Sequence, residues 1–143
     1  MQRAIALAKT AAAQNEFPVG AVVVDAGHII GEGFNQKEQQ SDPTAHAEMG
    51  ALRQAAAVKS TWRLTGCTLI TTLEPCPMCL GAILQARIDT VVYLAKDLRW
   101  GACGSIMDFS DHPELNHRCQ LVYAPNPSVV AMMRAFFKDQ GKR

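Results

Sequence analysis

The stretch TLITTLEPCPMCLGAILQARIDTVVYLA, residues 68–95, decides the fold that the sequence predicts. It begins with a short apolar segment rich in β-branched residues, Thr68–Leu73, which favours a strand. Pro75-Cys76-Pro77 is then typical of a helix start, and we expect that helix to end near Arg87. The strand pattern returns at Thr90–Ala95. A strand, a helix and a strand in succession predict a right-handed crossover, so the two strands should pair in parallel.

The segments on either side extend this unit. Before it we expect an amphipathic helix, a β-hairpin with a two-residue turn, a polar loop and a helix that starts at Asp42-Pro43, within Gln2–Gln14, Ala21–Gly31, Gly33–Gln40 and Asp42–Ala57. After it we expect a long irregular segment, a last strand and a closing helix, at Arg99–His117, Cys119–Ala124 and Ser128–Gln140. The prediction is a three-layer α/β/α fold with a mixed sheet of about five strands, in a single domain over residues 1–143.

The composition limits the class of protein. A length of 143 residues with 48% apolar content suffices for the core of one domain. There is no apolar run of about 18 residues and no leader pattern at the start, so we expect a cytoplasmic protein without a membrane role. The net charge of +1 gives no long-range field for a large polyanion, although a local patch and base stacking can still hold a short single-stranded RNA loop. Five cysteines without a repeating framework favour metal or redox roles over disulfides.

Two short motifs carry the side chains suited to catalysis, His46-Ala47-Glu48 and Pro75-Cys76-Pro77-Met78-Cys79. Cysteines three positions apart in the first turn of a helix lie on one side of it and can bind one tetrahedral ion, and the helix N-terminus favours their thiolates. Together with one imidazole they supply three ligands to zinc and leave a fourth position for water, as in catalytic zinc sites. Glu48 then lies near this water, without being a ligand, and can carry its proton.

The spacing of His46 and Glu48 predicts their place in the helix. Two residues apart in mid-helix, they would point about 200° apart around the axis, so we expect both at the first turn, where side chains can converge beyond the helix end. The combined pattern H-x-E…P-C-x-x-C is that of the zinc-dependent nucleobase deaminases. A C-x-x-C motif alone is as often a redox or structural motif as a catalytic one. The other cysteines, Cys67, Cys103 and Cys119, are expected to be small buried residues.

Nearly the whole chain, Ala4–Phe137, resembles the bacterial tRNA-specific adenosine deaminase (TadA) family of the cytidine-deaminase-like superfamily. The resemblance is carried by FPVGAVVV, GEGFN, DPTAHAEMGALR, TLEPCPMCLGAILQARI and GACGSIMDFSDHPELNHR, at residues 17–24, 31–35, 42–53, 72–88 and 101–118. It implies hydrolysis of the wobble adenosine in a tRNA anticodon stem-loop to inosine, with release of ammonia, by a homodimer with one zinc ion per chain. The chain departs from the family in lacking the residues ahead of the first helix and in having the bulky Trp100.

The resemblance also implies roles for particular residues. Zinc would be bound by His46, Cys76 and Cys79, and Glu48 would be the catalytic proton carrier. The residues implied to contact the flipped nucleoside are Asn35, Ala47, Val19 and Pro75. Those implied to contact the RNA loop are Lys96, Asp97, Arg99, Phe136, Phe137 and Lys138. Trp100, which lies beside Arg99 in the long irregular segment, is a further candidate for stacking on a base of this loop.

Alternative functions remain open at this point. The segment PCPMCLGAI also resembles bacterial guanine deaminases, so the substrate can instead be free guanine, converted to xanthine, or another base or nucleoside. A second alternative is a catalytically silent zinc protein that binds RNA, but such proteins often lose the proton-carrying glutamate and Glu48 is present. A third is a structural zinc site in a redox protein.

Overall fold

A five-stranded mixed sheet forms the centre of the molecule. The computed structural model describes residues 1–141, so the last two residues of the predicted domain lie outside the described part. The strands lie in the order β2-β1-β3-β4-β5, with β1 at Gly20–Asp25, β2 at His28–Phe34, β3 at Thr68–Thr71, β4 at Thr90–Tyr93 and β5 at Gln120–Tyr123. The helices are α1 at Gln2–Ala13, α2 at Lys37–Gln40, α3 at Ala47–Lys59, α4 at Pro77–Gln85 and α5 at Pro127–Gly141.

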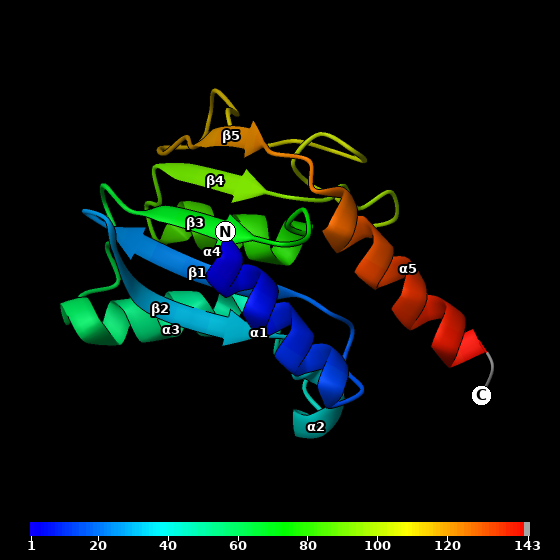
Figure 1. Cartoon of the computed structure of the whole chain (residues 1–143). Helices are drawn as coiled ribbons and strands as arrows, with labels where there is room; N and C mark the ends of the chain where they lie inside the picture. The colour runs from blue at the N-terminus through cyan, green and yellow to red at the C-terminus, as the bar shows by residue number, and fades with distance from the viewer. Residues whose placement is uncertain (142–143) are drawn as a thin grey trace.

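Helices cover both faces of this sheet. In Figure 1, α1 lies in front of the sheet, α3 and α4 lie behind it, and α5 lies on the side to which the arrowheads of β3 and β4 point. Strand β1 pairs antiparallel with both β2 and β3, whereas β3 pairs parallel with β4 and β4 parallel with β5. The predicted α/β fold with a mixed sheet between helices is therefore confirmed, and so is the parallel pairing around residues 68–95.

Two apolar clusters hold these layers together. The larger cluster joins the sheet to α3 and α4, and its buried members include Val23, Leu69, Leu52, Leu80 and Ile83. The smaller cluster attaches α5 to the end of β4, through Leu94, Ala95, Val129 and Met133. Among the helices within residues 1–141, none has the length and apolarity needed to cross a membrane.

The region between the hairpin and α3 differs from the sequence prediction. Residues 33–40 were expected to form a loop, but β2 continues to Phe34 and the short helix α2 follows. The strand is longer because Phe34 pairs with Gly20 at the start of β1. Helix α2 forms because the buried carboxylate of Glu16 accepts the backbone N–H groups of Glu38 and Gln39, at 3.1 and 2.9 Å.

The start of α3 was also predicted too early. The helix begins at Ala47, with His46 as its N-cap residue, and not at Asp42-Pro43. Asp42 instead closes a local turn, because its Oδ1 accepts the backbone N–H and the hydroxyl of Thr44, at 2.8 and 2.7 Å. The later start still places His46 and Glu48 at the first turn, as their spacing predicts.

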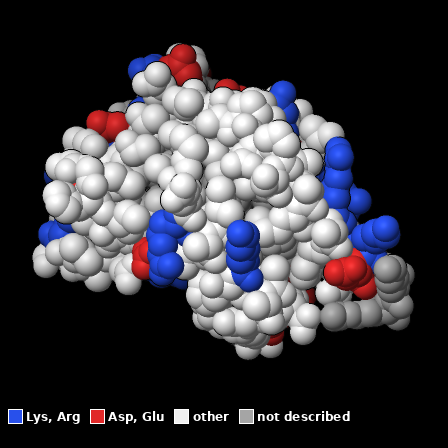
Figure 2. Space-filling model, in the orientation of Figure 1, with Lys and Arg blue, Asp and Glu red and all other residues white. Residues whose placement is uncertain are grey.

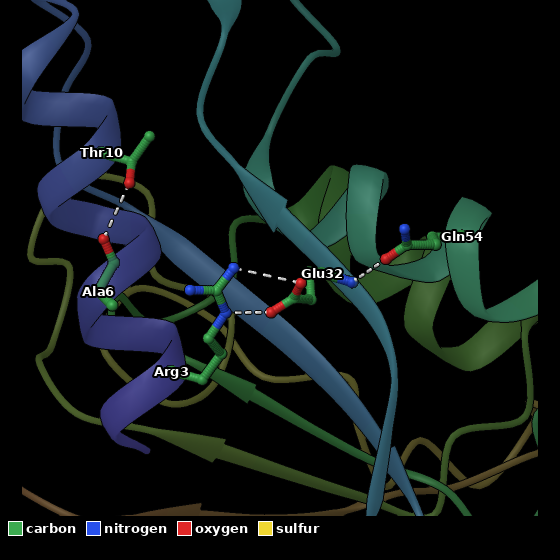
Figure 3. A network of polar contacts seen from close by, with 5 residues as sticks. All are labelled: Arg3, Ala6, Thr10, Glu32 and Gln54. Carbon is green, nitrogen blue, oxygen red and sulfur yellow. Dashed lines mark hydrogen bonds and ion pairs between the residues drawn. The ribbon is translucent and has the colours of Figure 1, made fainter.

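Strand β2 is held from both faces of the sheet. On one side Arg3 of α1 donates to the carboxylate of Glu32, and on the other the Glu32 backbone N–H donates to Oε1 of Gln54 in α3 at 2.6 Å (Figure 3). The backbones of β2 and α3 are also in direct contact, because a Cβ on Gly33 would lie 2.2 Å from the carbonyl oxygen of Ala47. These contacts fix the first turn of α3 against the sheet.

Candidate metal centre and substrate pocket

Three potential metal ligands meet where α3 and α4 begin. His46 and Cys76 are the N-cap residues of the two helices, and Cys79 lies in the first turn of α4. The Nδ1 atom of His46 lies 3.4 Å from Sγ of Cys79 and 3.7 Å from Sγ of Cys76, and all three ligand atoms lie within 4.8 Å of one another. A tetrahedral zinc ion, with bonds of about 2.3 Å to sulfur and about 2.0 Å to nitrogen, separates such atoms by about 3.6 Å. The three side chains therefore fit a zinc ion as they stand.

The electrostatics of the cluster favour a thiolate. Hydrogen bonding with Cys79, reinforced by His46, lowers the pKa of Cys76 to about 4. In contrast, burial raises the pKa of the Cys67 and Cys103 thiols and raises that of Cys119 to about 11. The N-terminus of a helix favours negative charge, and the N-termini of both α3 and α4 lie at this cluster. The hydrogen bond with Cys76, followed by burial, raises the pKa of Cys79, so only the first of the two expected thiolates is favoured before a cation binds. The three cysteines elsewhere are neutral buried thiols.

Glu48 lies beside the cluster without belonging to the ligand group. It is the second residue of α3 and is 4% exposed. Burial is the main cause that raises the pKa of its carboxyl group above the usual range. A raised pKa suits a carboxyl that must take up a proton and give it back near neutrality. The position and the pKa both favour a general acid–base.

A pocket of about 800 Å³ opens above these residues, and His46, Glu48 and Cys76 are among its lining residues. It lies at the edge of the sheet where β3 and β4 end and antiparallel β1 begins, which is the usual ligand position in an open α/β sheet. Asn35 follows β2 at the same edge, and its amide is fixed in orientation: Nδ2 donates to the Phe17 carbonyl and Oδ1 accepts the Lys37 N–H, at 3.3 and 3.1 Å.

The structure brings most of the predicted contact residues to this pocket. Those that line it are Val19, Asn35, Ala47, Lys96, Asp97, Arg99, Trp100 and Phe137. Pro75 is buried and is not among the lining residues. Phe136 packs edge-on against Phe17, with ring centroids 5.6 Å apart, and Lys138 is exposed outside the lining.

Sequence reasoning missed several residues of the pocket. Further lining residues are Phe17, Lys37, Leu98, Val130, Met133 and Arg134. It also missed Glu16 and Glu74, two carboxylates that are each 1% exposed and that accept backbone N–H groups of segments bordering the pocket. The available signal was a charged residue within an otherwise apolar stretch, as Glu74 is between Leu73 and Pro75.

Comparison with known proteins agrees with this geometry. Residues 1–95, which include all three ligands, match the family of the cytidine and deoxycytidylate deaminase zinc-binding region. The tRNA-specific adenosine deaminase of Haemophilus influenzae is 51% identical over 122 residues, which are 85% of this chain and 70% of that protein. That of Bacillus subtilis is 39% identical over an alignment of 144 positions, which covers 100% of this chain and 89% of that protein. The chain belongs to the tRNA-specific adenosine deaminase family. His46, Cys76 and Cys79 are the zinc site of this deaminase.

The chain is also similar to part of a longer protein and to solved structures of other deaminases. The tRNA(Ile)-lysidine synthase of Deinococcus radiodurans is 53% identical over 114 residues, 78% of this chain, but the chain spans only 20% of that protein. A solved structure from studies of A-to-I editing by tRNA:A34 deaminases has a TM-score of 0.82 and 37% identity, and covers 86% of this chain and 95% of its own. The structure of the guanine deaminase of Bacillus subtilis has a TM-score of 0.65 and 36% identity, and covers 96% of this chain and 90% of its own. The fold is thus cytidine-deaminase-like, as predicted.

Proposed function

We propose that the deaminase hydrolyses the wobble adenosine of a tRNA anticodon loop to inosine and releases ammonia. Family membership alone does not give the substrate, and the main support from the structure is the exposed part of the pocket lining, which we call the rim. Its aromatic residues Trp100 and Phe137 are 67% and 56% exposed. The Arg99 guanidinium lies 5.8 Å from the Phe137 ring centroid. Exposed aromatic rings beside arginine are typical surfaces for stacking unpaired bases, and a free base held inside a pocket has no need of them.

The charge distribution agrees with a small substrate loop. On the face seen in Figure 2, Lys and Arg side chains are scattered in small groups with wide uncharged areas between them. The exposed cations among the pocket lining are Lys37, Lys96, Arg99 and Arg134. Local cations of this kind can contact the phosphates on either side of one flipped nucleotide, whereas a long duplex is bound over a wider basic surface.

The site residues account for the proposed reaction. His46, Cys76 and Cys79 would hold a zinc ion, which would supply the Lewis acidity that makes water a nucleophile near neutral pH. Glu48 takes a proton from the water that adds to C6 of the adenine and delivers it to the ring nitrogen. It then transfers the proton of the new C6 hydroxyl to the amino group, so that the C6–N bond breaks, ammonia leaves and the carbonyl of inosine forms. Asn35 and the backbone N–H of Ala47, which lies in the first helical turn where N–H groups lack intrahelical acceptors, orient the base.

A comparison of substrates tests the proposal. The zinc-loaded protein is incubated in parallel with an anticodon stem-loop bearing wobble adenosine, free adenosine, guanine and cytosine, and the products are separated by chromatography. We expect inosine from the stem-loop and little or no conversion of the others. The similarity to the Bacillus subtilis guanine deaminase over most of both chains makes guanine the second candidate. Conversion of guanine without conversion of the stem-loop would replace our proposal with that activity.

We further propose that residues 1–143 act as one deaminase domain, in the cytoplasm, and as a homodimer. Support for the dimer comes from exposed apolar side chains in the segment between β4 and β5, where Ile106, Met107 and Leu115 are 53%, 46% and 42% exposed. Such side chains are commonly covered by a partner. Light scattering should give twice the mass of the chain, and a monomer at working concentrations would contradict the assembly without affecting the proposed reaction.

A further inference from the structure

The carboxylate of Glu74 is enclosed by the segment that follows β4. Its Oε1 accepts the backbone N–H of Asp97 at 3.1 Å and the hydroxyl of Ser105. Its Oε2 accepts the backbone N–H groups of Cys103 and Ser105, at 2.9 and 3.1 Å. The side chain is 1% exposed, so these four donors replace water around a buried acidic group. Residues 97–105 are therefore folded around one internal carboxylate.

The segment held in this way carries part of the pocket rim. The Asp97 Oδ1 atom accepts the N–H groups of Arg99 and Trp100, at 3.0 and 3.1 Å, and the Asp97 carbonyl accepts the N–H of Gly101 at 2.9 Å. These bonds close a turn whose side chains line the pocket. The turn begins at the residue whose N–H binds Glu74, so the carboxylate fixes the position of Arg99 and Trp100.

The same carboxylate is tied to the metal centre through the chain. Glu74 precedes Cys76 by two residues, and the intervening Pro75 carbonyl accepts the N–H of Ala102 at 2.9 Å. Gly101 lies directly against the carboxylate, since a Cβ there would lie 2.3 Å from Oε2 of Glu74. The buried residues Glu74 and Pro75 thus connect the rim turn to the segment that carries the zinc cysteines.

We propose that Glu74 is a positioning residue for the nucleic-acid substrate, which sets the rim turn of residues 97–100 at a fixed place relative to the zinc site. The proposal rests on the proposed function, because the rim is taken to contact an RNA loop. It predicts that loss of the Glu74 anchor weakens binding of the stem-loop while the metal centre stays intact. Glu74 is among the residues that line the pocket, but its carboxylate is bonded to the rim segment and acts in this role through that segment.

Glu74→Gln removes one contact selectively. If the glutamine oxygen takes the Oε2 position, it keeps the N–H groups of Cys103 and Ser105. The new NH₂ group then faces the Ser105 hydroxyl, which can rotate to accept, and the Asp97 N–H, which cannot. In the reverse orientation the NH₂ group would face the backbone N–H groups of Cys103 and Ser105, two donors instead of one. The first orientation is therefore favoured, and the substitution should break only the hydrogen bond from the Asp97 N–H. Glu16→Gln is the matched control, because Glu16 is an equally buried carboxylate that holds the N–H groups of α2 instead.

The experiment combines kinetics on the wobble-adenosine stem-loop with amide exchange measured by NMR on zinc-loaded protein. For Glu74→Gln we expect one zinc per chain, faster exchange at the Asp97 amide, and a KM raised ~10-fold or more with kcat within ~3-fold of wild type, the pattern of lost binding and not of lost chemistry. Glu16→Gln should speed exchange at Glu38 and Gln39 and leave Asp97 protected. If Glu74→Gln does not fold, Ser105→Ala, which removes the hydroxyl donor that shares Oε1 with the Asp97 N–H, should give smaller changes of KM and Asp97 exchange in the same direction.

The outcomes separate this inference from the proposed function. A wild-type protein that is inactive on the stem-loop refutes the proposed function, and the exchange at Asp97 still decides whether Glu74 anchors the turn. Unchanged Asp97 exchange in a folded variant overturns the anchor. If exchange at the Asp97 amide becomes faster but KM is unchanged, the proposed effect of the anchor on stem-loop binding is overturned. A loss confined to kcat and zinc content would mean that Glu74 supports the metal centre instead.

Discussion

Glu48 is the residue on which the proposed chemistry depends most, because it is buried beside the zinc ligands without being one of them. Glu48→Gln keeps the shape of the side chain but removes its ability to accept a proton. We expect the variant to retain about one zinc ion per chain and to lose ~100-fold or more in kcat, as is usual when a general acid–base is removed. Metal analysis and single-turnover rates on the stem-loop test this prediction. Wild-type turnover in the variant would disprove the role.

Trp100 offers a test of the rim at the same scale. Its indole is 67% exposed and lines the pocket, so truncation should weaken stacking with a base that flanks the reacting nucleotide. We expect Trp100→Ala to raise KM for the stem-loop ~5-fold or more while kcat changes little. Trp62→Ala is the control, since Trp62 is 54% exposed in the segment before β3 and is absent from the pocket lining. Equal effects of the two substitutions would count against a specific contact.

Among the secondary-structure elements, the contact of β2 with α3 is the one that places a zinc ligand. Gly33 allows this contact, so Gly33→Ala must push the first turn of α3 away from the strand. We expect the free energy of unfolding to fall by ~1–3 kcal/mol, as in other overpacked sites, together with weaker zinc binding. Gly81→Ala in α4, where a Cβ meets nothing within 4 Å, should not destabilise the protein. Denaturant unfolding and zinc titration of both variants provide the comparison, and equal stability of Gly33→Ala and wild type would refute the packing argument.

The elements also show what the sequence could and could not predict. The strands, the main helices and the parallel pairing were predictable, since each has its own periodicity and its own end signals. The start of α3 was wrong because aspartate before proline favours a turn and a helix cap equally well, and only the contact with Thr44 separates the two. Helix α2 was missed because it depends on Glu16, more than twenty residues earlier in the chain.

The site followed the same division. His46, Cys76 and Cys79 were predictable because metal ligands at helix starts have short, characteristic spacings. Arg134 and Met133 were not, because α5 reaches the pocket only through tertiary packing. The hydrogen-bond partners of Glu74 were not predictable for the same reason, as they lie 23 to 31 residues further along the chain.

At the scale of the whole molecule, zinc joins α3 to α4 and should stabilise the fold. A ligand that binds only the folded state raises the free energy of unfolding, so removal of zinc by a chelator should lower the Tm by ~5–10 °C. Cys79→Ala should lose zinc and show the same low Tm without chelator. Cys119→Ala, which alters a buried thiol outside the ligand cluster, should keep its zinc. A Tm insensitive to chelator, with zinc shown to be gone, would mean that the metal has no part in stability.

The order of the site residues along the chain has a consequence for how such enzymes diversify. The three ligands and Glu48 all precede residue 80, whereas most of the rim, from Lys96 to Phe137, comes from the part of the chain that follows the family match at residue 95. The zinc ligands and Glu48 thus lie in the earlier segment together with the residues proposed to orient the base, whereas most of the rim lies in the later segment. Substitutions in the later segment should therefore change what the rim contacts while the zinc ligands and Glu48 stay in place.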